Sequence, residues 1–341
     1  MPALRSRIKD NRAARTALFL TQNALVAARS LVAPRVSTAF REGVEHELAA
    51  MIRVKDEVRF LPEWLAHHVN LGFQHIYVYD NNSSDGTADV LAPFAARGLV
   101  THVPWAPVPA SPAAEYDFLH RFGAACGWVA FFDADEFLFE ARPGELAAVL
   151  QDHAHRPAVA VCWRYFGSSG HETIPRGLVT ERFHMADAAY NRHVKVIARP
   201  SQIVRARNSH SFYYRHGRLA VTPGGRRVFG SFVTPPTRQP RLVLHHYVYR
   251  SREDVERKAR RGYVDGQGDR ERSRSLTLAD NEFDRRNDVH VEPDRRVVAA
   301  TADLLRELGF PAELHAPPSP ERSPAAATPT TAGTNGPPTT G

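Results

Sequence analysis

Short apolar runs alternate with segments of helical periodicity along the first half of the chain. The runs are typical of buried strands, and the segments between them carry helix signals, such as Pro62 at a start and Gly72 at a stop. Strands are predicted at 48–54, 75–79, 99–103, 128–132, 158–166, 194–198 and 241–248. Helices are predicted from Pro62, from Thr87, from Ser111 as N-cap, and near 143–153, 252–261 and 294–308. This alternation predicts an α/β fold with a mostly parallel sheet and helices on both faces.

The two ends of the chain differ from its middle in composition. Residues 1–41 hold eight Lys or Arg and one acid, Asp10, and so account for the whole net charge of +7. Residues 316–341 are rich in Pro, Thr, Ala and Gly, a composition that cannot bury enough surface to offset chain entropy. We predict a basic N-terminal arm at 1–45, an α/β domain at 46–315 and a disordered tail at 316–341. Because the body is neutral, the charge gives no support for nucleic-acid binding.

The basic arm contains thirteen uncharged residues, 16–28, ended by Arg29. This stretch is too short and too polar to span a bilayer, and its signal-peptide features are weak. Two alternatives stay open: a basic amphipathic helix on a membrane surface, and a helix that is solvated or packed on the domain. We expect a cytoplasmic protein, with peripheral contact to the inner face of the membrane through residues 1–41 as one alternative.

The two cysteines, Cys126 and Cys162, fit no metal-ligand spacing. They are predicted to be free buried thiols in a reducing compartment.

Three carboxylates interrupt the apolar stretch "FFDADEFLF" at 131–139. Unpaired charge is costly in such a setting, so these groups need a partner or a place at the mouth of a strand. Asp133 and Asp135 are two apart and point to one side of an extended segment, an arrangement that suits Mg²⁺ or Mn²⁺. The alternative is that these acids cap the following turn or pair with nearby Arg.

A second polar segment, "YVYDNNSSDGT" at 77–87, also follows a predicted strand. Its residues are good turn and cap formers, and Asp85 or Ser84 is expected to cap the next helix. Asp80 or Asn81 is a candidate to bind a nucleotide base or ribose. Ligands of open α/β sheets sit beyond the carboxyl ends of strands, so both motifs are expected to face one crevice.

These motifs, together with "WRYFGSSGH" and "HHYVYRSREDVERKARRG", resemble the bacterial family 2-like glycosyltransferases, close to glycosyltransferase family 92. The resemblance covers roughly 48–265. It implies a GT-A fold, a nucleotide-sugar donor with a UDP-sugar as first choice, Mn²⁺ or Mg²⁺, and inversion at the anomeric carbon. The acceptor it implies is a glycan, a lipid or a cell-surface polymer. Asp56 departs from the Asn-Glu pair that such proteins often show.

The resemblance also implies roles for individual residues. Asp133 and Asp135 would hold the metal on the diphosphate, with His246 or Tyr247 reaching it from late in the chain. Lys258 would stabilise departing charge. The nucleoside end would be lined by Arg53, Glu57, Asp80, Asn81 and Asp85. For His246 and Lys258 the plain alternatives are a structural histidine at a strand end and a solvated lysine.

No Asp or Glu occurs from Ala188 to Arg252, although this segment holds thirteen Lys or Arg. It is either a basic surface strip or a wall facing an anionic ligand, such as the diphosphate, an anionic acceptor or a lipid surface. An inverting transfer needs a base near the acceptor hydroxyl. Glu172, after the glycine-bearing turn at 167–170, is the first candidate, with Asp187 and Glu181 in reserve. His171 is a candidate to bind the acceptor.

Two other functional classes are alternatives for this sequence. A phosphatase of the haloacid dehalogenase class also places Asp-x-Asp after a buried strand, but Phe137 stands where such enzymes have Thr or Val. A non-catalytic relative that binds carbohydrate or nucleotide is the other alternative, although the intact acidic pair argues against it.

Overall fold

The computed structural model describes residues 12–32, 44–108, 110–208, 210–233, 240–248, 250–261 and 286–315. The predicted tail at 316–341 lies outside the described residues, as do the parts of the arm at 1–11 and 33–43. Gly262, the expected end of the helix at 252–261, also lies outside them. The division into arm, domain and tail therefore stays a prediction.

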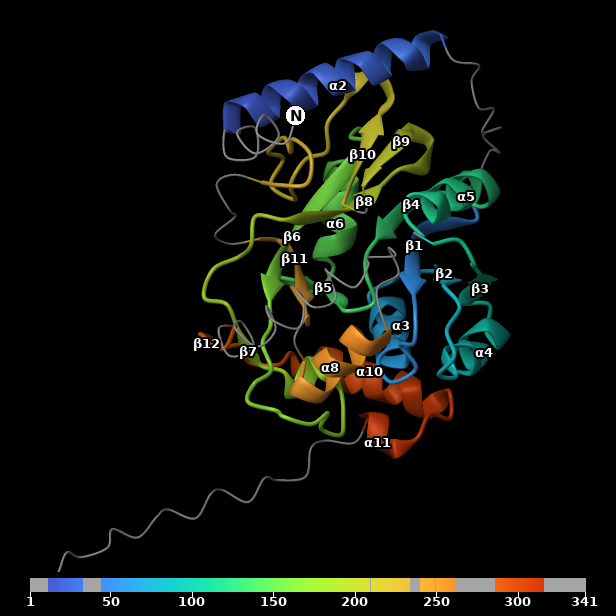
Figure 1. Cartoon of the computed structure of the whole chain (residues 1–341), viewed down its shortest axis with the longest axis vertical. Helices are drawn as coiled ribbons and strands as arrows, with labels where there is room; N and C mark the ends of the chain where they lie inside the picture. The colour runs from blue at the N-terminus through green and yellow to red at the C-terminus, as the bar shows by residue number, and fades with distance from the viewer. Residues whose placement is uncertain are drawn as a thin grey trace, which may run out of the picture.

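An eight-stranded sheet runs through the middle of the described structure (Figure 1). Its strands are β1 (His46–Val54), β2 (His75–Asp80), β3 (Val100–Pro104), β4 (Cys126–Phe131), β5 (Glu136–Glu140), β6 (Ala158–Tyr165), β8 (Val194–Ala198) and β11 (Leu242–His246). The order is β3-β2-β1-β4-β8-β6-β11-β5. Neighbours are parallel from β3 to β4 and between β6 and β11, whereas β8 and β5 run antiparallel to theirs. Six strands of this described sheet share one direction, which confirms the mostly parallel α/β prediction.

The remaining described elements cover the sheet or extend it. The helices are α2 (Arg12–Val32), α3 (Leu61–Asn70), α4 (Thr87–Ala96), α5 (Ala113–Arg121), α6 (Glu145–Asp152), α7 (Val179–Arg182), α8 (Arg252–Arg261), α10 (Arg295–Glu307) and α11 (Ala312–His315). The short strands are β7 (Met185–Ala186), β9 (Ile203–Asn208), β10 (Ser211–Tyr214) and β12 (Val289–His290), and η3 (Arg215–Gly217) is a 3₁₀ turn.

Alternate residues of β1 bury into opposite cores, as the two-residue period of a strand requires. Ala50 and Ile52 pack with residues of α3, α4, α6 and α10 on one face. Ala49 and Met51 pack with α5, β9 and β10 on the other. The prediction of cover on both faces is thus confirmed.

Local signals place the first helices as expected. Pro62 stands in the first turn of α3, and Gly72 adopts a positive φ of 96° just after it. Pro93 lies inside α4. The prediction of Ser111 as N-cap of α5 is wrong: Pro112 holds that position and no side chain caps the helix. Ser251 does accept a hydrogen bond from the Asp254 N–H at the start of α8, as the capping pattern predicts.

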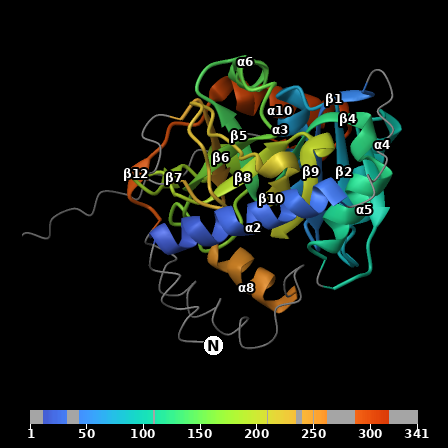
Figure 2. The ribbon, with the colours of Figure 1, turned by 90° about the horizontal axis from the view of Figure 1, so that it is seen from above.

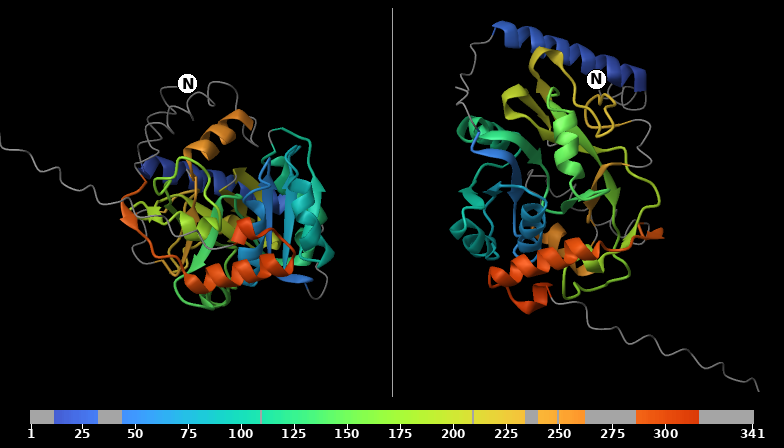
Figure 3. Two further views of the ribbon diagram at one scale, coloured as in Figure 1. Left: turned by 90° about the horizontal axis from the view of Figure 1, so that it is seen from below. Right: turned by 180° about the vertical axis from the view of Figure 1, so that it is seen from behind.

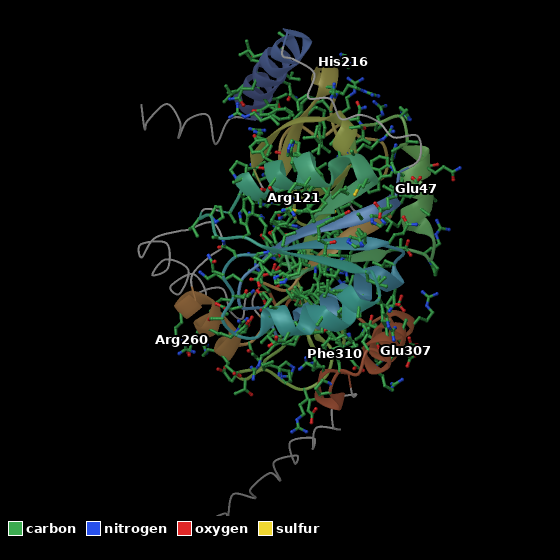
Figure 4. The ribbon with its side chains drawn as sticks, turned by 90° about the vertical axis from the view of Figure 1, so that its right-hand side faces the viewer. Glu47, Arg121, His216, Arg260, Glu307 and Phe310 are labelled. Carbon is green, nitrogen blue, oxygen red and sulfur yellow. The ribbon has the colours of Figure 1, made fainter. Side chains whose placement is uncertain are left out.

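Two helices far apart in sequence lie on the outside of this architecture. Helix α2 lies across β10 and η3 at one end of the molecule (Figures 1 and 2). Helix α10 packs against α3 at the other end (Figure 3). Figure 4 shows Glu307 and Phe310 at the end of α10, where Glu307 pairs with Arg97 and the Phe310 ring contacts Phe94.

Truncating a core side chain of α5 should destabilise the fold far more than truncating an exposed one. Phe118 is fully buried, whereas Tyr116 of the same helix is 40% exposed. We expect Phe118→Ala to lower the free energy of unfolding by about 3–5 kcal/mol, and Tyr116→Ala by about 0.5 kcal/mol. Urea denaturation followed by circular dichroism measures both values, and equal losses would contradict this packing.

Candidate active site

The acidic motif forms the turn between β4 and the antiparallel edge strand β5. The Glu136 N–H donates to the Asp133 carbonyl at 3.0 Å and closes the turn. The Trp64 indole N–H donates to the Glu136 carbonyl at 2.7 Å, and the Tyr247 N–H donates to the Asp135 carbonyl at 2.9 Å. The apolar residues around the motif fill the core below it, so the two Asp side chains are fixed at the end of β4.

Asp133 is neutralised by two cations from different strands. Its Oδ2 accepts from Lys195 Nζ at 2.6 Å, and its Oδ1 lies 3.5 Å from the Arg53 guanidinium. Burial raises the pKa of Asp133, but Lys195 and Arg53 outweigh it and leave the pKa below its usual value. The Asp133 side chain nevertheless remains 39% exposed, so it can still meet a ligand.

Asp135 has a separate pair of partners. Its Oδ2 accepts from Lys258 Nζ at 2.9 Å, and its Oδ1 lies 3.4 Å from His246 Nε2. Burial opposes ionisation of Asp135, but Lys258 and His246 hold its pKa well below the usual value. The structure thus brings together four of the predicted residues: Asp133, Asp135, His246 and Lys258.

Glu136 is the carboxyl group that stays buried. Its Oε2 accepts from the Asp133 N–H at 3.0 Å and lies 3.7 Å from Lys195 Nζ. Its Oε1 has no hydrogen-bond partner within the described part of the chain. Burial raises the pKa of Glu136 well above its usual value, which favours the neutral acid.

Lys195 was not predicted as a site residue, although the sequence around it indicates a buried charge. It is the charged residue inside β8, an otherwise apolar strand of sequence VKVIA, and its side chain is 1% exposed. A lysine at such a position needs a buried acid within reach. Glu115 was missed in the same way: it is 3% exposed at the side chain and lies 3.5 Å from Arg53.

Three of the predicted nucleoside residues, Asp80, Asn81 and Asp85, lie at the turn after β2 and are bonded both within it and to neighbouring segments. Asp80 accepts from the Ser83 N–H and lies 3.2 Å from His102, while Asn81 donates to the Trp105 and Pro107 carbonyls. Asp85 accepts from the Thr87 N–H at 2.9 Å and from the Val58 N–H at 3.0 Å. The expected turn role is therefore confirmed. The expected capping by Asp85 or Ser84 is wrong, because the N-cap of α4 is Gly86 and no side chain makes a cap hydrogen bond there. Nucleotide contact stays a prediction.

Arg250 and Arg257 hold the segment around α8 against the loop that contains Glu57. Arg250 is buried, with its guanidinium 2.8 Å from Asp254 and 3.5 Å from Glu57, and it lies over the Phe60 ring. Arg257 donates to the Asp56 carbonyl at 2.5 Å. This docking carries Lys258 to Asp135, whereas Arg260 of the same helix is exposed (Figure 4).

The candidate bases lie in different surroundings. Glu172 is 68% exposed at the side chain and pairs with Arg252 at 2.9 Å, at the start of α8. Lys258 lies six positions after Arg252, about 9 Å along a helix. Asp187 is 16% exposed and pairs with Arg286 at 2.6 Å. Glu181 pairs with Arg295, and the His171 ring contacts Phe183.

Contacts between rings connect Asp187 to the acidic pair. The Arg286 guanidinium lies 4.4 Å from the centre of the Tyr165 ring, and that ring lies 5.1 Å from His246. His246 in turn reaches Asp135. Glu172 pairs instead with Arg252 at the start of α8, the helix that brings Lys258 to Asp135.

Three histidines surround Trp163 beside the lysine-bound Asp133: His193, His210 and His246. Burial and Lys195 lower the pKa of His210 to about 3, so this ring is neutral. No three His, Cys, Asp or Glu side chains in the described part of the chain are arranged to hold a metal by themselves. Cys126 and Cys162 form no disulfide and are buried, as predicted.

A cavity of about 220 Å³ lies on the other side of β11 from the acidic pair. His245 and Tyr247 line it, whereas His246, between them in sequence, faces Asp135. The cavity is therefore separate from the candidate active site.

The fold and the site define an α/β protein with paired carboxylates at the strand ends, the arrangement typical of ligand sites in such sheets. The model of glycosyltransferase family 92 matches residues 49–258, and the chain belongs to that family. This confirms the family 92 part of the resemblance, while the relation to bacterial family 2 proteins stays a prediction.

The similar proteins include family 92 members from plants. One from Oryza sativa subsp. japonica is 30% identical over 225 residues, which are 63% of this chain and 35% of that protein. One from Arabidopsis thaliana is 29% identical over 197 residues, 52% of this chain and 33% of that protein. The chain thus spans about a third of the length of these relatives.

Solved structures show lower similarity. Staphylococcus aureus TarS 1–349 in complex with UDP is 13% identical, with a TM-score of 0.35 over 76% of this chain and 80% of that one. Glucosyl-3-phosphoglycerate synthase from Mycobacterium tuberculosis, in complex with Mn²⁺, UDP and glucosyl-3-phosphoglycerate, is 17% identical, with a TM-score of 0.26 over 38% of this chain and 50% of that one.

Replacing Lys195 by Met should destabilise the protein in a pH-dependent way. The change leaves Asp133 and Glu136 without their shared cation, and we expect a loss of about 2–3 kcal/mol at pH 7, below the cost at a fully buried pair because Asp133 is part exposed. The depressed pKa of Asp133 stabilises the parent above the unfolded pKa of about 4, and this contribution disappears as pH falls. The difference between the two proteins should therefore stay constant from pH 7 to about pH 4 and shrink at lower pH, as Asp133 of the parent becomes protonated.

Urea denaturation across this pH range measures the effect. The double variant Lys195→Met/Asp133→Asn is the control, because removing both charges should restore part of the stability. A double variant no more stable than Lys195→Met would contradict the assigned ion pair.

Proposed function

We propose that the chain transfers a sugar from a nucleotide-sugar donor, with a UDP-sugar as first choice, to a carbohydrate or lipid-linked acceptor, with inversion. The observation that carries the proposal is the acidic turn after β4, whose two carboxylates are held at the strand ends among basic side chains. Family 92 membership supports the reaction class. The Asp80–Asp85 turn follows β2, two strands away in the sheet and at the same edge, and would take the nucleoside.

The donor set at this turn fits a divalent cation. Asp133 and Asp135 offer carboxylate oxygens, the ligands that Mg²⁺ and Mn²⁺ prefer, and His246 adds a nitrogen that suits Mn²⁺. A cation that keeps water and phosphate oxygens needs few protein ligands, so the lack of a three-residue cluster among the described residues is compatible with it. Such an ion would supply positive charge to the diphosphate.

The chain's own cations would assist the leaving group. Lys258 and Lys195 contact the acidic pair directly, and Arg53 lies beside Asp133. Lys258 lies in α8, which Arg250 and Arg257 hold in place, and its ammonium group would stabilise negative charge on the departing diphosphate. The arrangement stabilises negative charge without moving the backbone.

Changing Asp135 to Asn should remove most metal-dependent donor binding. The amide is isosteric but lacks the charge that a divalent cation requires. We expect the affinity for UDP in the presence of Mn²⁺ to fall at least about tenfold, as isothermal titration calorimetry would show. Glu307→Gln, an exposed change at the end of α10, is the matched control and should bind as the parent does. Parent-like binding by Asp135→Asn would refute the metal assignment.

We propose Asp187 rather than Glu172 as the base. Asp187 is largely screened from solvent and connects to Asp135 through Arg286, Tyr165 and His246, whereas Glu172 is exposed and pairs at the start of α8. A base placed beside the reacting centre can take the acceptor proton as the new bond forms.

Replacing the base by its amide should lower kcat and leave donor binding alone. We expect Asp187→Asn to reduce transfer by roughly 10²–10⁴-fold with little change in donor KM. Glu172→Gln removes the same charge from an exposed ion pair and should keep most activity. The assay is steady-state transfer to a panel of sugar acceptors. If Glu172→Gln loses activity and Asp187→Asn does not, Glu172 is the base.

A donor-binding relative without turnover is the second candidate. It is favoured by one observation: both Asp side chains already have a lysine partner, so the turn is stable without a metal. Tight UDP-sugar binding with neither transfer nor donor hydrolysis would support it. For the phosphatase alternative, the position expected to hold Thr or Val is occupied by Phe137, whose ring is fully buried in the core.

A further inference from the structure

The solvent-exposed positions of helix α2 whose side chains are described are all uncharged. Of the large apolar residues exposed in the described structure, three lie on this helix: Leu18 at 43%, Leu20 at 44% and Leu25 at 59%. The other exposed positions with described side chains are small or hydroxylated. They are Ala13, Ala17, Thr21, Ala24 and Ala28. None of these eight side chains carries a charge, which is unusual for the solvent side of a surface helix.

The opposite face of α2 is docked on the domain. Phe19 is 4% exposed and stacks on Tyr213 at 6.1 Å between ring centres. The Tyr213 hydroxyl donates to Gln22 at 2.8 Å. One face of the helix therefore packs on the domain, whereas Leu18, Leu20 and Leu25 remain 43–59% exposed.

The surface beside α2 is basic. Helix α2 packs on β10 and η3, which belong to the segment from Ala188 to Arg252 that contains no acid. Arg205, Arg207 and Arg218 are exposed there, and the Arg207 guanidinium lies 4.5 Å from the centre of the Phe19 ring. Figure 4 shows His216 of η3 next to the helix. In sequence, residues 1–41 add eight Lys or Arg against one acid.

We propose that this end of the molecule binds the surface of an anionic lipid bilayer, with Leu18, Leu20 and Leu25 entering the headgroup region. An apolar helix face bordered by basic residues is the combination that adsorbs to such a surface. No described helix is long and apolar enough to cross a membrane. This inference does not depend on the proposed transfer reaction.

The charge decides between a bilayer and a second copy of the chain. Two copies meeting through α2 would bring two basic arms and two acid-free surfaces together, which costs electrostatic free energy. An anionic bilayer would instead neutralise them, with about 1 kcal/mol for each basic residue held near the surface as the usual scale of such attraction. The acid-free segment from Ala188 to Arg252 lies partly beside α2. The anionic bilayer would therefore be a ligand for this segment as well.

Vesicle co-sedimentation of the full chain tests the proposal. The probes are phosphatidylcholine vesicles with and without phosphatidylglycerol, at low and at high salt. We expect sedimentation with the anionic vesicles only, weakened by salt because the attraction is screened. The double variant Leu18→Gln/Leu25→Gln should lower the partition coefficient about tenfold or more.

Two controls keep the test decisive. Val108→Gln changes an apolar residue that is 57% exposed elsewhere and should bind vesicles as the parent does. Equal melting curves for parent and double variant show that the fold is kept. The proposal is overturned if the double variant sediments like the parent, or if the parent does not sediment with anionic vesicles. It is also overturned if light scattering shows a parent dimer that the double variant dissociates while vesicle binding is unchanged.

Discussion

Neutralisation of Asp133 and Asp135 is the interaction on which the rest of this structure depends. Two carboxylates at the end of a buried strand would each be costly without a counter-charge. Lys195 contacts one at 2.6 Å and Lys258 contacts the other at 2.9 Å, with Arg53 and His246 completing the balance. The turn is thus charged, ordered and partly open, which is what a site for an anionic ligand and a cation requires.

The side chains that neutralise Asp133 and Asp135 come from parts of the chain that lie far apart in sequence. Lys195 comes from β8, the antiparallel strand inserted between β4 and β6, and Lys258 comes from α8. Arg250, buried against Glu57, Asp254 and the Phe60 ring, docks α8 so that Lys258 can reach Asp135. The late part of the family 92 region is therefore needed to complete a site whose acids come from its middle.

Local patterns were enough to predict most elements and the acidic pair. Strands β1, β2, β4 and β8 and helices α3, α8 and α10 fall where the apolar spacing and the caps place them. The edge strand β5 was not predicted, because its residues Glu136–Glu140 read as the end of the acidic motif. Lys195 and Glu115 were not predicted as site residues, because the role of a buried charge becomes visible only with its partner. The partners, Asp133 and Arg53, lie in other elements of the fold.

The central claim is that the lysine-bound acidic turn is where a metal and a nucleotide diphosphate bind. Crystals of the full chain soaked with Mn²⁺ and UDP, measured at the manganese absorption edge, test it most directly. We expect an anomalous peak beside Asp133 and Asp135, with Lys258 turned from Asp135 toward phosphate. UDP bound elsewhere, or bound at this turn with both lysine pairs intact and no anomalous peak, would contradict it.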